Sequence, residues 1–69
     1  MIEVFKTDIR EATQADGIIA LLLQQFPGTR VNIDLHDCDK VLRIEGKDFL
    51  PDAVMQLVSD NGFMCGVLE

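Results

Sequence analysis

Two stretches of the chain carry apolar residues at every third or fourth position, which is the spacing of one buried helix face. The first, residues 13–26, is followed by Pro27-Gly28, and the second, residues 48–60, by Asn61-Gly62. Proline cannot continue a helix and glycine accepts positive φ, so both pairs mark helix ends. We expect the buried faces to consist of Ala15, Ile18, Ile19, Leu22, Leu23 and Phe26 in the first helix and of Val54, Leu57 and Val58 in the second.

Short polar residues at the helix starts indicate where each helix begins. For the first helix, Thr13 with Asp16 resembles a capping box, and Asp8 with Glu11 is a competing start one turn earlier. For the second helix we expect Asp48 to be the N-cap, because an aspartate oxygen accepts hydrogen bonds from the first free N–H groups. A proline in the first turn of that helix is compatible with this start, since its missing N–H costs little there.

Four further stretches have the composition or the alternation of strands: residues 2–6, 30–36, 40–45 and 63–68. Residues 30–36 alternate most clearly, with apolar side chains on one side and polar ones on the other. In residues 63–68 we expect the inward positions to be Phe63, Cys65 and Val67 and the outward positions to be Met64, Gly66 and Leu68.

The predicted order is β-α-β-β-α-β, and it fills residues 1–69 as a single domain. Strand–helix–strand crossovers are almost always right-handed, and each helix has one apolar face, so both helices must cover the same side of one sheet. This is the α+β, ferredoxin-like arrangement, with a four-stranded antiparallel sheet in the order 4-1-3-2 and two helices on one face. The other sheet face is left to water or to a partner.

Composition narrows the function classes. Twelve acidic against six basic residues give a net charge of −6, which argues against nucleic-acid binding because an acidic field repels phosphates. Sixty-nine residues are few for an enzyme, and there is no Ser/His/Asp set. The longest apolar run, residues 18–23, is far below the roughly 20 residues of a membrane span. With two cysteines and no signal-peptide pattern, we expect a reduced, cytoplasmic, non-enzymatic protein.

The predicted topology brings three connections to one end of the sheet: residues 7–12, 36–39 and 61–63. Imidazole, thiolate and carboxylate together suit a divalent transition metal such as zinc. The opposing interpretation is that polar residues gather there because turns need them, and His-x-Cys is not a zinc signature. The sequence favours this second interpretation. The candidate ligands are Asp8, Glu11, His36, Cys38 and Asp39.

The chain ends in G-F-M-C-G-V-L-E, with Gly62-Phe63 opening the last predicted strand. With this ending, its length and its element order, the chain resembles the heavy-metal-associated, copper-chaperone-like domain family from residue 2 to residue 69. That family binds soft metals through M-x-C-x-x-C in the loop after the first strand, whereas this loop reads T-D-I-R-E-A-T-Q, without cysteine. The resemblance implies that Ile9 takes the methionine's place as a buried loop residue, and that Phe63 lies by this loop. It also implies the fold without the Cu(I) site.

Three functions are consistent with these observations. The first is a small interaction module, since apolar Met64 and Leu68 are predicted to face outward and a protein partner or a second copy of the chain would cover them. The second is a divalent metal-binding domain that uses the His36, Cys38 and carboxylate end. The third is a small-ligand regulatory domain, for which no residue identifies a ligand.

Overall fold

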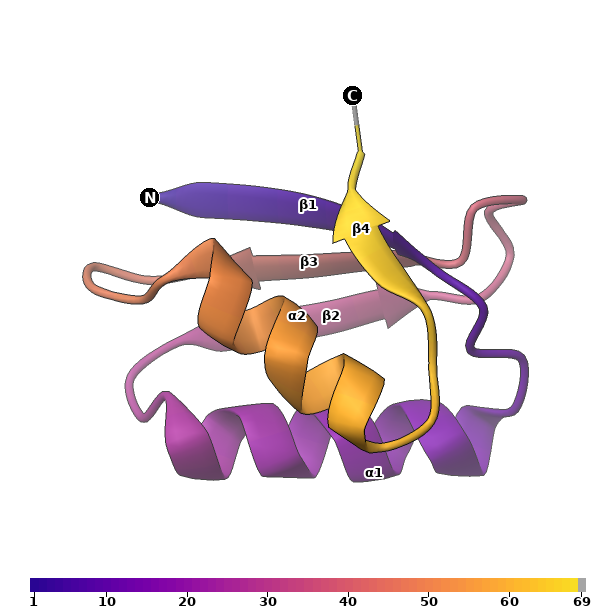
Figure 1. Ribbon diagram of the computed structural model, residues 1–69, viewed down its shortest axis with the longest axis horizontal. Coiled ribbons are helices and arrows are strands. Elements are labelled where there is room, and N and C mark those ends of the chain that lie inside the picture. Colours follow the sequence, from indigo (N-terminus) through magenta and orange to yellow (C-terminus); the bar gives the residue numbers. More distant parts are fainter. Residues whose placement is uncertain (69) are drawn as a thin grey trace.

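The computed structural model describes residues 1–68 as one sheet with two helices (Figure 1). Along the chain the elements are β1 (Ile2–Thr7), α1 (Ala12–Gln25), β2 (Arg30–Asp34), β3 (Val41–Glu45), α2 (Pro51–Asp60) and β4 (Cys65–Val67). The strands are antiparallel in the order β2-β3-β1-β4, which is the predicted order counted from the other edge. The predicted fold class is therefore confirmed.

The strand register separates a helix-facing side of the sheet from an open side. Phe5 lies opposite Leu42 and opposite Val67, and Glu3 lies opposite Ile44. Phe5, Leu42 and Ile44 are fully buried in one cluster with the apolar residues of both helices. Both helices therefore cover the same side of the sheet, as Figure 1 shows. The core consists of Phe5, Ile9, Ala15, Ile18, Leu22, Leu42, Ile44, Phe49, Val54 and Val58.

Helix α1 begins at neither of the two predicted starts. Its N-cap is Glu11, whose N–H donates to Gln14 Oε1 at 3.2 Å, so the capping pair is shifted by two residues from Thr13 and Asp16. The assignment of Leu23 to the buried face is also wrong, because 43% of this side chain is exposed. Leu22 points into the core and successive helix residues are about 100° apart, so the next residue turns away from the sheet.

Helix α2 begins at Pro51, three residues later than predicted, and its N-cap is Leu50 rather than Asp48. The residue before a proline avoids helical φ and ψ, which keeps Leu50 extended at φ −98° and ψ 125°. The delay lets Phe49 reach the core from the loop, where only 5% of it is exposed. Within residues 1–68, neither helix is long and apolar enough to cross a membrane.

The strands β2 and β4 are shorter than predicted. The strand β2 ends at Asp34, whose Oδ1 accepts the His36 N–H at 3.0 Å and turns the chain out of the sheet. Val67 lies on the helix-facing side opposite Phe5, as predicted, but 41% of it is exposed because β4 is an edge strand. Leu68 is half-buried rather than exposed.

The helix stops are confirmed, since Gly28 and Gly62 have φ of 85° and 91°.

Candidate functional site

The three predicted connections do meet at one end of the sheet. The Thr7 N–H donates to the Asp39 carbonyl oxygen at 2.9 Å, and Thr7 Oγ1 donates to the Lys40 carbonyl oxygen at 2.6 Å. These bonds join the loop after β1 to the β2–β3 turn. The Met64 N–H donates to Asp8 Oδ1 at 2.7 Å and joins the same loop to the start of β4. We call this region the loop end.

The structure brings only part of the predicted ligand set together. Asp37, Cys38 and Asp39 each offer one ligand atom, and these atoms lie within 4.8 Å of one another. All three residues are exposed and consecutive, and the Asp39 N–H donates to Asp37 Oδ1 at 2.9 Å, which forms a tight turn. His36 is exposed and does not belong to the group. The tight turn alone therefore explains why these three side chains lie close together.

The other two predicted ligands have structural partners of their own. Asp8 accepts the Met64 N–H, and Glu11 caps helix α1. Neither joins the Asp37, Cys38 and Asp39 group among residues 1–68. Zinc sites in proteins combine three or four His, Cys or carboxylate ligands in a defined shell, whereas this turn offers one thiol and exposed carboxylates. The divalent metal at this end stays a prediction.

A hollow of about 340 Å³ lies at the loop end, and both cysteines line it. Cys38 is exposed, whereas Cys65 is half-buried and packs against the core. Burial raises the pKa of the Cys65 thiol to about 11, because desolvation disfavours the thiolate. His36 is not among the residues that line the hollow.

We expect the two thiols to react with iodoacetamide at very different rates at pH 8. The thiolate is the reactive species, and a pKa of about 11 leaves about one Cys65 thiol in a thousand ionised. Cys38 should be alkylated first, and the Cys65 rate should rise about tenfold per pH unit up to pH 11. Peptide mapping by mass spectrometry measures both rates, and equal rates at pH 8 would contradict the prediction. Protection of Cys38 by added Zn²⁺ would favour the metal hypothesis.

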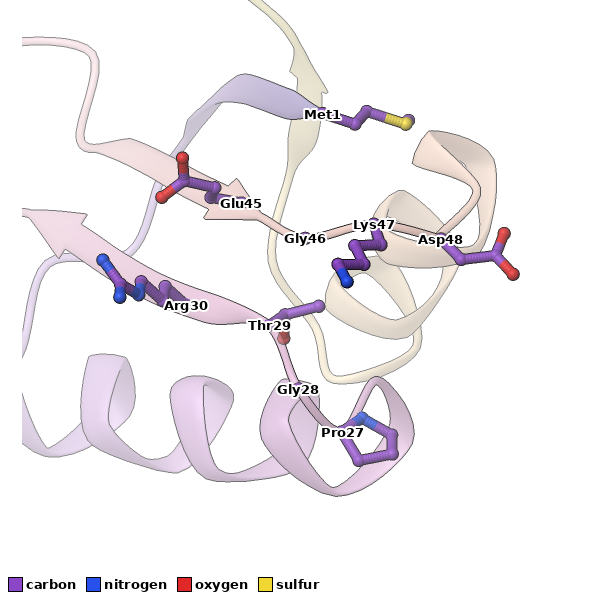
Figure 2. A pocket seen from close by; sticks show the side chains of 9 residues that line it. All are labelled: Met1, Pro27, Gly28, Thr29, Arg30, Glu45, Gly46, Lys47 and Asp48. Atoms are coloured by element: carbon purple, nitrogen blue, oxygen red, sulfur yellow. The ribbon is translucent and has the colours of Figure 1, made fainter.

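A second hollow, of about 570 Å³, lies at the opposite end of the sheet and was not predicted from the sequence (Figure 2). The α1–β2 loop, the β3–α2 loop and Met1 form it. A Cβ on Gly46 would lie 2.7 Å from Thr29 Cγ2, so the glycine allows the two loops to approach. Figure 2 shows the Asp48 carboxylate pointing away from the charged ends of Arg30 and Glu45, so the three do not converge on a ligand. The only feature of the sequence that relates to this hollow is a glycine in each of the two loops, Gly28 and Gly46.

The open side of the sheet is the third candidate surface. The register places ten paired residues on it: Ile2, Val4, Lys6, Arg30, Asn32, Asp34, Val41, Arg43, Glu45 and Gly66. Val4 lies near the centre of this face, and the Leu68 N–H donates to its carbonyl oxygen at 2.9 Å. Met64, which precedes β4 on the same side by alternation, is 72% exposed. Of the two predicted interface residues, Met64 is thus fully available, and Leu68 only in part.

The chain's sequence matches no protein-family model and no curated protein. The heavy-metal-associated resemblance therefore stays a prediction.

Proposed function

We propose that this chain is a non-enzymatic interaction module that binds a segment of another protein on the open side of its sheet. The segment we infer is extended and combines acidic with apolar side chains. The observation that carries the proposal is the charge of the open side, where cations outnumber acids although the whole chain has a net charge of −6.

The apolar part of this face is continuous across β1 and β4. Val4 and Leu68 are neighbours through the Leu68 N–H bond, and both are half-buried without a helix above them. Ile2 lies next to Val4 on the same side of β1 and is 47% exposed. Met64, which is 72% exposed, is separated from Leu68 by Gly66 and the Lys6 side chain. Scattered surface hydrophobes are normal, but a contiguous group on an uncovered sheet face favours a docking surface.

The charge of the face favours an acidic partner. Three of the chain's six cations lie there, namely Lys6, Arg30 and Arg43, with two acids, Asp34 and Glu45. The other acids of residues 1–68 are not among the paired residues of this face, and the molecule is 19 Å thick along its shortest axis. Because the Debye length is about 8 Å at physiological salt, a partner at the open face is largely screened from the far side. Complementary charge at the rim then directs binding.

We also propose that the chain is a divergent relative of the heavy-metal-associated domains that has their fold but lacks their metal-binding motif. The element order and the buried position of Ile9 in the loop after β1 support this relationship. The loop supplies no thiol, and Cu(I) prefers two thiolates. Without that motif, the residues of the domain favour protein binding on the open side of the sheet over metal binding.

A titration of the ¹⁵N-labelled chain with a synthetic peptide of alternating glutamate and leucine tests the proposal. We expect the largest amide shifts at Val4, Arg43 and Leu68, since these surround the centre of the open face. Arg43→Asp should weaken binding at least several-fold because it reverses a central charge. Arg10→Asp, which makes the same charge change in the exposed loop after β1, is the matched control and should leave the affinity nearly unchanged. Shifts confined to the helices, or no shift at millimolar peptide, would refute the proposal.

A further inference from the structure

The strand β2 is an edge whose outer side has no partner within the described chain. It pairs only with β3, through five consecutive residues from Arg30 to Asp34. Apart from that pairing, no backbone group of Arg30–Asp34 makes a hydrogen bond with another backbone group of residues 1–68. A free edge of this kind is a template for an added strand. The question is which strand its side chains fit.

We infer that two copies of the chain pair antiparallel along β2, about a two-fold axis through Asn32, and join their sheets edge to edge. In this register Arg30 of one copy lies opposite Asp34 of the other, and the pair occurs twice by symmetry. Asn32 lies opposite its own copy. All three of these side chains are exposed on the open side of the sheet, so cation and carboxylate are free to meet there. Opposite charges directly across a strand pair are stabilising.

The helix-facing side of β2 fits the same register. Val31 and Ile33 are half-buried and pack against the core. In the dimer, Val31 of one copy would lie opposite Ile33 of the other. The two-fold axis is perpendicular to the sheet, so the helices of both copies stay on one side. The exposed parts of Val31 and Ile33 are then covered by the other copy. Their burial stabilises the dimer in addition to the backbone hydrogen bonds between the two strands.

Other registers lose these pairings. A one-residue slip places apolar residues opposite polar ones and reverses the faces of the two sheets. A two-residue slip places Asn32 opposite either Arg30 or Asp34, which removes both charge pairs. The polar residues of β2 are thus self-complementary in a single alignment. The dimer uses the edge of the sheet rather than the centre of the open face, although it engages Arg30, one of the three cations of that face.

The Asp34 carboxylate is already held in place for this contact. Its Oδ1 accepts the His36 N–H at 3.0 Å, which fixes the side chain and leaves Oδ2 to accept from a guanidinium. Within one copy, the cross-strand neighbour of Arg30 is Glu45, which is the competing partner. Figure 2 shows the side chains of these two residues extending the same way from neighbouring strands. A second copy therefore offers Asp34 to Arg30 in competition with Glu45 of the same chain.

Analytical ultracentrifugation of charge-reversed variants tests the inference. We expect the wild-type chain to dimerise with rising concentration at about 0.15 M salt, where the mutual repulsion of two acidic chains is screened beyond about 8 Å. Arg30→Asp or Asp34→Arg alone should raise the dimer dissociation constant about tenfold or more, because two attractive pairs become repulsive. A mixture of the two single variants should form a heterodimer, since its charges are again opposite at both pairs.

The double variant Arg30→Asp/Asp34→Arg should dimerise like the wild type, and Arg10→Asp, with the net charge of Arg30→Asp, should not affect dimerisation. Circular dichroism of each variant shows whether it is folded. Because the heterodimer and the double variant require gain of association, loss of folding cannot produce the expected result. A wild-type chain that is monomeric at millimolar concentration, or single variants that associate as well as the wild type, would overturn the inference.

Discussion

Replacing Phe49 by alanine is expected to lower the free energy of unfolding by about 3–5 kcal/mol. Phe49 is 5% exposed and belongs to the core cluster, although it lies in the loop before α2. Removing its ring takes away apolar burial and leaves a cavity between the sheet and α2. A domain of this length has a total stability of about 3–10 kcal/mol, so the variant should be largely unfolded or close to it. Urea denaturation followed by circular dichroism measures the change.

The neighbouring residue supplies the control. Leu50→Ala removes a side chain of similar size that is 71% exposed, and it should change the stability by less than about 0.5 kcal/mol. Phe49→Leu keeps most of the apolar volume and should cost much less than alanine. Equal losses for Phe49→Ala and Leu50→Ala would mean that the loop before α2 does not fill the core.

The sheet was predictable because its signal is local and repeated. In β2, Val31 and Ile33 alternate with three polar residues, and this period of two occurs only in strands. In α1, Ala15, Ile18 and Leu22 have the helical period and are all buried. Once six such elements are ordered, handedness and the single apolar face of each helix leave little choice of topology. The element order and the sheet order therefore followed from the sequence.

The ends of the elements were less predictable because they depend on tertiary contacts. Asp48 has the right side chain for an N-cap, but Phe49 beside it is drawn into the core and Pro51 delays the helix. Helix α1 likewise uses Glu11, whose side chain ranks low among cap residues. For α2 the buried position of Phe49 delays the start, and no local pattern contains that information.

The candidate sites were likewise predictable in part: their place in the fold followed from the topology, but the grouping of their side chains did not. Topology correctly brought the loop after β1, the β2–β3 turn and the start of β4 to one end, as the Met64–Asp8 hydrogen bond shows. It could not tell which side chains come together, since His36 does not belong to the Asp37, Cys38 and Asp39 group. The hollow in Figure 2 is assembled from loops far apart in the sequence, so no motif indicated it.

Replacing Ile9 by alanine is expected to lower the free energy of unfolding by about 2–5 kcal/mol, an unusual cost for a loop residue. Ile9 follows β1 outside any regular element, yet it is fully buried in the core cluster. The Ile9 N–H also donates to Thr7 Oγ1 at 3.2 Å, which fixes the chain at this turn. The side chain anchors the loop that carries Asp8, so its loss should also loosen the loop end.

A graded series separates packing from loop conformation. Ile9→Val removes one methylene and should cost about 0.5–1.5 kcal/mol, and Arg10→Ala next to it, which is exposed, should cost less than about 0.5 kcal/mol. Hydrogen exchange should show faster exchange of the Met64 amide in Ile9→Ala, because its acceptor Asp8 lies in the loosened loop. If Ile9→Ala were as stable as Arg10→Ala, the loop after β1 would not be anchored in the core.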